Sequence, residues 1–161
     1  MKVLFCNCRG LGSKAKEEAM KDLIRLSQPD ILLIQETKME KEELLQVSGK
    51  FWNKGGGLAV SSRGASKEII TQWDDHKFGL IESKYYLHWI PTKLLHKDSN
   101  IQVTLFNIYV PAMYAEKKDC RNLLRDERSI GSLNKVILTG DLNVTLNQDE
   151  KRGGSLVRDP I

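Results

Sequence analysis

The feature that most constrains this chain is the stretch 135–143, where a short apolar run ends in a pair of polar side chains. Residues 136–138 have the length and branching of a buried strand. The run then breaks at Gly140, and Asp141 and Asn143 follow with one apolar residue between them. Side chains two positions apart in an extended chain point to one face, so we expect a carboxylate and a carboxamide side by side. Ligands collect where buried α/β strands end, although Gly, Asp and Asn are also ordinary turn residues.

Length and composition are typical of a single soluble globular domain. The chain has 161 residues, of which 40% are hydrophobic and 29% charged, and we find no linker, repeat or low-complexity segment that would divide it. A formal charge of +4 and an isoelectric point near 8.9 are mildly basic. This balance is compatible with a polyanionic partner but does not by itself indicate one. We therefore expect one domain over residues 1–161.

The cysteines and the apolar runs predict an intracellular protein, in the nucleus or the cytoplasm, rather than a secreted one. Three cysteines are an odd number, and the N-terminal apolar run is too short for a secretory signal. No stretch approaches the roughly 18 apolar residues of a membrane span, so no membrane partner is expected. We expect reduced thiols without a disulfide partner. Cys6 and Cys8 are interpreted as small residues at a strand end rather than as a zinc site.

The first part of the sequence predicts a βαβ unit. An apolar strand over 2–7 ends at Asn7, and a helix over about 13–27 follows, with a capping serine and apolar residues at helical spacing. A continuous apolar strand over 30–35 then ends at Glu36. A carboxylate at the end of a buried strand is costly unless it is paired or binds a cation. The alternatives are a turn asparagine for Asn7 and a solvated helix-start residue for Glu36.

The middle of the chain predicts short strands in succession, which favours antiparallel pairing and therefore a mixed sheet. After a helix over about 40–47, strands are expected at 58–60, 69–71, 78–81 and 85–90. The three histidines have no metal-ligand spacing, and we expect each of them at the surface or at an edge: His76, His88 and His96.

The clearest strand of the chain is 101–110, in which positions alternate between two faces. Tyr109 lies near its end, and a tyrosine there is a large apolar ring with a hydroxyl group that seeks a partner. A simple core tyrosine is the alternative. After Pro111 we expect a helix from Tyr114 to about Arg128, whose basic residues, Lys117 among them, are interpreted as a solvated face.

Four expected strands thus end in polar groups, and their order resembles that of the endonuclease/exonuclease/phosphatase superfamily. The shared patterns are N-x-x-G-L, Q-E, N-I-Y-x-P and G-D-x-N, each after an apolar run. In this sequence they read Asn7-Cys8-Arg9-Gly10-Leu11, Gln35-Glu36-Thr37, Asn107-Ile108-Tyr109-Val110-Pro111 and Gly140-Asp141-Leu142-Asn143. Each pattern is weak alone, and the four in this order carry the resemblance.

Within that superfamily the sequence looks most like the endonuclease domain of plant LINE-type (non-long-terminal-repeat) retrotransposons. The cues are Arg-Gly-Leu-Gly at 9–12, Gln-Glu-Thr-Lys at 35–38 and Glu-Lys-Arg-Gly-Gly at 150–154. Such domains nick double-stranded DNA to prime reverse transcription, so the resemblance implies DNA as the partner.

The resemblance also implies an α/β fold, a four-layer sandwich of two mixed sheets flanked by helices, and phosphodiester hydrolysis with Mg²⁺ or, in its place, Mn²⁺. Glu36 would ligate the metal, since Mg²⁺ prefers carboxylate and water oxygens. Asp141 would align or deprotonate the attacking water, and Asn143 would position Asp141 or a phosphate oxygen. Asn7 would orient the Glu36 side of the site, and Tyr109 would hydrogen-bond the phosphate.

The sequence departs from the family pattern in two places. Family members carry a Ser-Asp-His motif near the C-terminus, whose histidine contacts the scissile phosphate, and this sequence has none and reaches about two thirds of the usual domain. Arg9 stands where relatives often have Asp or Asn. We therefore expect a domain without its C-terminal third that is weak or inactive as a nuclease, because a positioned acid–base group contributes about 10²–10⁴ in rate.

Three alternatives stay open at the level of the sequence. The chain could be another hydrolase of the superfamily, such as an abasic-site endonuclease or a phosphatase of small phosphoesters. It could be a non-catalytic retroelement remnant or a DNA-binding module. It could also be an α/β domain in which the four motifs are unrelated turns.

Overall fold

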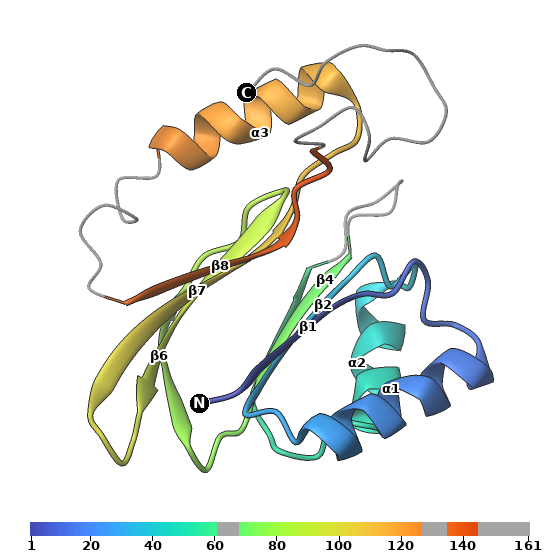
Figure 1. Ribbon diagram of the computed structural model, residues 1–161, viewed down its shortest axis with the longest axis vertical. Coiled ribbons are helices and arrows are strands. Elements are labelled where there is room, and N and C mark those ends of the chain that lie inside the picture. Colours follow the sequence, from blue (N-terminus) through green and yellow to red (C-terminus); the bar gives the residue numbers. More distant parts are fainter. Residues whose placement is uncertain (61–67, 127–134, 145–161) are drawn as a thin grey trace.

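The computed structural model describes residues 1–60, 68–126 and 135–144, which form eight strands and three helices (Figure 1). In chain order the elements are β1 (Val3–Asn7), α1 (Lys14–Ser27), β2 (Ile31–Gln35), α2 (Lys41–Gly49), β3 (Gly57–Val60), β4 (Ile69–Trp73), β5 (Phe78–Ser83), β6 (Trp89–His96), β7 (Ile101–Tyr109), α3 (Tyr114–Asp126) and β8 (Val136–Asp141). The loop expected at 147–154, with its Glu-Lys-Arg-Gly-Gly cue, and the helix end expected at Arg128 lie outside the described residues.

The strands form two mixed sheets, as the family resemblance implied, and each sheet has four strands. The first sheet has the order β1-β2-β4-β3, in which β1 and β2 are parallel and the remaining pairs antiparallel. The second has the order β5-β6-β7-β8, in which β7 and β8 are parallel. Each sheet therefore contains one parallel pair, and parallel neighbours end at the same edge of their sheet.

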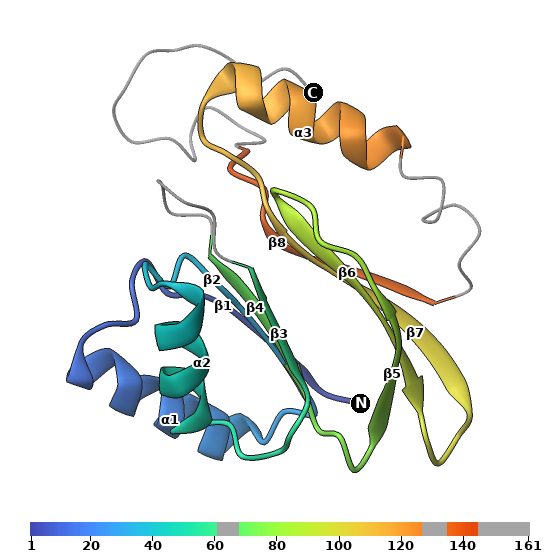
Figure 2. The same cartoon turned by 180° about the vertical axis from the view of Figure 1, so that it is seen from behind.

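The two sheets face each other, and helices cover their outer faces, which completes the four-layer sandwich (Figures 1 and 2). Between the sheets, β2 and β4 pack against β5, β6 and β7 through a buried apolar cluster that includes Leu33, Trp73 and Leu105. Helices α1 and α2 pack on the outer face of the first sheet through a second cluster. Helix α3 packs on the outer face of the second sheet through Cys120 and Leu124. Burial of each large apolar side chain contributes about 1.5–3 kcal/mol.

Local sequence explains the first helix well. Ser13 has an extended backbone and its hydroxyl oxygen accepts a hydrogen bond from the Lys16 backbone N–H at 3.4 Å, as an N-cap residue does. At the other end, Gln28 has a left-handed backbone and its N–H donates to the Ile24 carbonyl. The chain then passes Pro29, which cannot continue a helix, and enters β2.

The structure corrects three expectations about strand bounds and burial. The strand expected at 85–90 is instead β6, which begins at Trp89 and runs through Pro91 to His96. His88 was expected at the surface or an edge, but it is only 6% exposed. Lys117 was assigned to a solvated face, but it is only 3% exposed. In the described part of the chain, no helix is long and apolar enough to cross a membrane.

Candidate active site

The ends of both parallel strand pairs meet at one end of the sandwich. Asn7, the last residue of β1, is the register partner of Gln35 on β2, and Glu36 follows directly. Tyr109, the last residue of β7, is the register partner of Asp141 on β8. Strands β1 and β8 lie in contact across the two sheets. The five residues that the sequence singled out, Asn7, Glu36, Tyr109, Asp141 and Asn143, therefore lie together.

Asn7 joins the two carboxylates of the site. Its side-chain nitrogen donates one hydrogen bond to Glu36 Oε1 at 2.8 Å and another to Asp141 Oδ2 at 2.8 Å. A carboxamide nitrogen has two hydrogens, so both donors are used. The Asn7 side-chain oxygen accepts the backbone N–H of Arg9 at 3.2 Å. Asn7 therefore holds one carboxylate from each sheet at a defined separation.

The pair Asp141 and Asn143 is close for a reason that the sequence pattern did not provide. An extended chain was expected to place both side chains on one face, but Asn143 has a left-handed backbone with φ 48°. Its backbone N–H turns back and donates to Asp141 Oδ1 at 2.8 Å, while its side-chain nitrogen donates to the Val110 carbonyl at 2.7 Å. The segment is an aspartate-stabilised turn rather than a strand. Both Asp141 carboxylate oxygens thus accept a hydrogen bond, one from Asn7 and one from Asn143.

Tyr109 is half-buried beside both carboxylates. Burial raises the pKa of its phenol, and the neighbouring Glu36 carboxylate, which accepts a hydrogen bond from it, raises the pKa further. Asn143 hydrogen-bonds the same hydroxyl group and acts in the opposite direction on this pKa. The phenol therefore keeps its proton at neutral pH and is available as a hydrogen-bond donor within the site.

Gln35 connects the two sheets directly beneath these residues. Its side-chain oxygen accepts the Asp141 backbone N–H at 2.9 Å, and its side-chain nitrogen donates to Asn107 Oδ1 at 2.8 Å and to the Ile108 carbonyl. Asn107 in turn donates to the Ile70 carbonyl at 2.9 Å. Gln35 and Asn107 are both fully buried, and their bonds to each other and to the Ile108 and Ile70 carbonyls are buried, whereas the bond to the Asp141 N–H is partly buried. This network fixes the position of the Asp141 backbone relative to β1 and β2.

Replacing Gln35 with leucine is expected to lower the free energy of unfolding by about 2 kcal/mol. The change leaves the Asp141 N–H and Asn107 Oδ1 without their partner, and a buried unpaired polar group costs about 1–3 kcal/mol. Chemical denaturation followed by circular dichroism measures the effect. The matched control is Gln46→Leu on the exposed side of α2, which should stay within about 0.5 kcal/mol. Equal stability of the two variants would contradict the structural role of Gln35.

The chemistry of the site fits a hard divalent cation. Glu36 and Asp141 supply one carboxylate from each sheet, and among the described residues neither of them forms a salt bridge. The described residues contain no cluster of three or more His, Cys, Asp or Glu side chains that could enclose a metal. Mg²⁺ suits such a place because it commonly keeps several water ligands and takes only one or two carboxylates from the protein.

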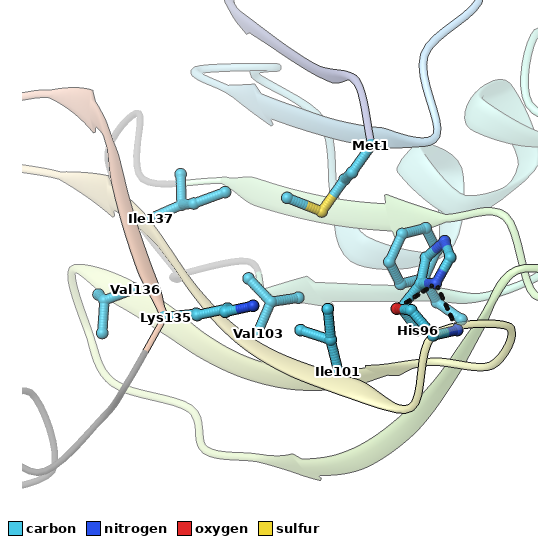
Figure 3. Close-up of a pocket in the computed structure, with 9 residues that line it drawn as sticks. Met1, His96, Ile101, Val103, Lys135, Val136 and Ile137 are labelled. Atoms are coloured by element: carbon cyan, nitrogen blue, oxygen red, sulfur yellow. Dashed lines mark hydrogen bonds between the residues drawn. The ribbon is translucent and has the colours of Figure 1, made fainter.

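A separate cavity of about 560 Å³ lies at the opposite end of the second sheet (Figure 3). It is lined by residues at the starts of β5, β7 and β8 and at the end of β6, with Met1 from the chain start: Met1, Phe78, His96, Ser99, Ile101, Val103, Lys135, Val136 and Ile137. None of the five candidate site residues lines it. The cavity is mostly apolar, and it has no part in the chemistry described above.

Sequence reasoning missed three residues that shape the site. Gln35 was quoted only as part of a motif, although a glutamine inside a continuous apolar strand signals a buried hydrogen-bonding role. Asn107 shares one face of the alternating strand with Val103 and Leu105, both in the core. Lys117 lies three positions before Cys120 and seven before Leu124, a spacing that places it on the same, buried face of α3.

The fold of this chain is similar to that of several solved proteins. No curated protein sequence matches the chain. Among solved structures, it is similar to an AP endonuclease from Archaeoglobus fulgidus, with a TM-score of 0.71 and 15% identity over 95% of this chain and 61% of that one. It is similar to TDP2 from Caenorhabditis elegans, with a TM-score of 0.65 and 19% identity over 97% of this chain and 50% of that one. It is also similar to D. rerio TDP2 complexed with single strand DNA product, with a TM-score of 0.65 and 14% identity over 90% of this chain and 61% of that one.

These identities are low, so the likeness establishes the fold alone, and the chain spans about half to two thirds of the length of each of these three proteins. The model of one protein family, however, matches residues 3–158, nearly the whole sequence. The match includes all four motifs at the strand ends and all five residues that meet there. The chain belongs to the Endonuclease/Exonuclease/phosphatase family.

Proposed function

We propose that this chain is a Mg²⁺-dependent phosphodiester hydrolase that nicks DNA, of the kind found in LINE-type retrotransposons. The single observation that carries the proposal is the Asn7 carboxamide, which lies 2.8 Å from a carboxylate of each sheet. Enzymes of this family generally use divalent metal ions, and the two carboxylates are suitable ligands. The retrotransposon assignment rests on the sequence motifs quoted above.

Each residue of the site has a role that follows from its contacts. Glu36 would hold the metal, which when bound polarises the scissile phosphate and stabilises the leaving oxygen. Asp141 would orient the attacking water and accept its proton, since Asn7 and Asn143 fix both of its oxygens. Tyr109, which keeps its proton, would donate to a phosphate oxygen once substrate displaces its contact with Glu36. Asn143 would therefore act on Asp141 rather than on the phosphate.

Basic side chains beside the site support a polyanionic substrate. The loops after β1 and β2 run together, because the Gly10 and Leu11 backbone N–H groups donate to the carbonyls of Glu36 and Thr37. Arg9 and Lys38 are exposed on these loops. The D. rerio TDP2 structure contains DNA. Exposed cations of this kind contact nucleic-acid phosphates without reading their sequence.

The test of the proposed function is nicking of supercoiled plasmid by the purified 161-residue chain, with Mg²⁺ and with chelator. We expect nicking that chelator abolishes, because Glu36 and Asp141 would supply the carboxylate ligands of a divalent cation. A folded chain that nicks equally with and without metal would contradict the proposal. So would a folded chain that does not nick at all.

Charge removal at the loops is expected to weaken DNA binding and its dependence on salt. In Arg9→Gln/Lys38→Gln, the slope of log affinity against log salt should fall by about 1 for each lost phosphate contact. Fluorescence anisotropy with labelled duplex DNA over a salt series measures this slope. The control Lys97→Gln removes an exposed cation from the turn between β6 and β7, at the far end of the sheet, and should leave the slope unchanged. Equal slopes in all variants would rule out this surface as the DNA contact.

A second candidate function is a module that binds DNA without cleaving it, which the exposed cations Arg9 and Lys38 beside the site would also support. Such a chain would show the same salt-dependent binding but no nicking in Mg²⁺ or Mn²⁺. The plasmid assay and the anisotropy assay together therefore separate the two functions.

A further inference from the structure

Lys117 of α3 is a buried cation that the chemistry above does not use. It is 3% exposed, and lysine is almost never buried to this extent unless its charge is paired or hydrogen-bonded. Its ammonium group donates to the Asn143 carbonyl at 2.5 Å. The next residue of the helix, Lys118, is exposed, so the two neighbouring lysines have opposite surroundings.

The position of Lys117 on the helix explains where its side chain points. Lys117, Cys120 and Leu124 lie on the side of α3 that faces the second sheet, and the latter two pack against it with Trp89 and Val110. The alkyl stem of a lysine can lie along such an apolar surface while its charged end reaches a polar group. Here the polar group belongs to the turn that follows β8.

Asn143 is consequently held from three sides. Its carbonyl accepts from Lys117, its side-chain nitrogen donates to the Val110 carbonyl, and its backbone N–H donates to Asp141 Oδ1. Its backbone is left-handed, with φ 48°, a conformation that asparagine adopts more readily than most non-glycine residues. A hydrogen bond from an ammonium group is stronger than one between neutral groups. Two of these bonds to Asn143 involve a charged group: the Lys117 ammonium group of α3 and the Asp141 carboxylate.

We propose that Lys117 is a positioning residue, which holds the turn at Asn143 and thereby fixes the orientation of the Asp141 carboxylate. This inference rests on the proposed function where it concerns rate, and on the fold alone where it concerns the turn. Lys117 does not touch substrate in this role. It connects the helix on the outer face of the second sheet to the catalytic end of the sandwich.

The test compares Lys117→Met, which keeps the length of the stem, with Lys117→Arg and with the control Lys118→Met. For nicking, we expect Lys117→Met to lower kcat about ten- to a hundredfold with little change in KM, as a displaced catalytic group does. Lys117→Arg keeps a cationic donor and should recover most of the rate. Lys118→Met should match the unaltered chain. Melting curves by circular dichroism establish that each variant is folded at the assay temperature.

A second readout does not depend on activity. The Asn143 amide hydrogen, which is bonded to Asp141, should exchange with solvent about tenfold faster or more in Lys117→Met when followed by NMR, and at the unaltered rate in Lys118→Met. Unchanged Asn143 exchange in a folded Lys117→Met would overturn the proposal, as would an unchanged kcat. If the unaltered chain does not nick at all, the proposed function fails, and the exchange rate alone decides the role of Lys117.

Discussion

Asp141→Asn is expected to abolish metal-dependent nicking, with a loss of at least about 10²–10⁴ in rate. The aspartate accepts two hydrogen bonds, one on each carboxylate oxygen, from Asn7 and from the Asn143 N–H. An asparagine has one acceptor oxygen and one NH₂ group, so it can satisfy only one of these donors, and it cannot take a proton from water. The change removes the proposed base and disturbs the hydrogen bonds that orient it, while it preserves the size of the side chain.

Glu36→Gln is expected to give a loss of similar size for a different reason. It keeps an oxygen that can accept from Asn7 but removes the negative charge that a divalent cation requires. Activity measured against Mg²⁺ concentration separates the two variants. Added metal should partly restore the Glu36 variant, because weakened binding can be overcome by concentration, and should not restore the Asp141 variant.

The control for both variants is Asp22→Asn on the exposed face of α1, where the carboxylate pairs with Arg25. Its nicking rate should equal that of the unaltered chain, since exposed ion pairs contribute little to stability. If both site variants nicked DNA at the unaltered rate, the assignment of the site would be wrong. The geometry at Asn7 would then describe only a structural contact between the sheets.

The strands and their polar ends were predictable because they depend on local patterns. A continuous apolar run such as 31–34 indicates a strand that is buried on both faces, and the structure shows this for β2. The fold class followed from the resemblance. In that fold, parallel neighbouring strands end at the same edge of their sheet, which explains why the residues at the strand ends lie close together. Asn7, Glu36 and Asp141 therefore met as the motif order implied.

The contacts that hold these residues were not predictable from local pattern. Asn7 and Asp141 are 134 positions apart, and Gln35 and Asn107 are 72 apart, so only the packing of one sheet on the other reveals their pairing. The burial of Lys117 was hidden because its neighbours in sequence are charged and the helix is polar on most sides. The expected strand stopped at residue 90, directly before Pro91, whereas β6 continues through it to His96, since proline is tolerated in a strand where its missing N–H is not needed.

Gly140→Ala is expected to be the most destabilising single change at the site, with a loss of at least about 3 kcal/mol in the free energy of unfolding. Gly140 lies within β8 at φ 153°. A Cβ atom there would lie 1.8 Å from the Ile108 carbonyl oxygen and 2.7 Å from the Gln35 side-chain nitrogen. Neither atom can retreat, because the two are hydrogen-bonded to each other and Gln35 also holds the Asp141 N–H.

The matched control for this change is Gly49→Ala at the end of α2. No atom lies within 4 Å of a Cβ at that position, and alanine favours helix more than glycine does, so its effect should be between zero and about 1 kcal/mol of stabilisation. Thermal melting compares the two variants, at about 2–4 °C for each kcal/mol in a domain of this size.

Nicking by Gly140→Ala is then measured well below its melting temperature. It tests whether the close contact of β7 and β8 at Gly140 affects the nicking rate as well as the stability. The same clash that destabilises β8 displaces Asp141, the next residue, from the N–H contact with Gln35. We therefore expect the folded fraction of Gly140→Ala to nick far more slowly than the unaltered chain. If the folded variant were stable and fully active, the two strands would separate at Gly140 without cost. The position of Asp141 would then be set by Asn7 and Asn143 alone, and the buried glutamine would have no part in it.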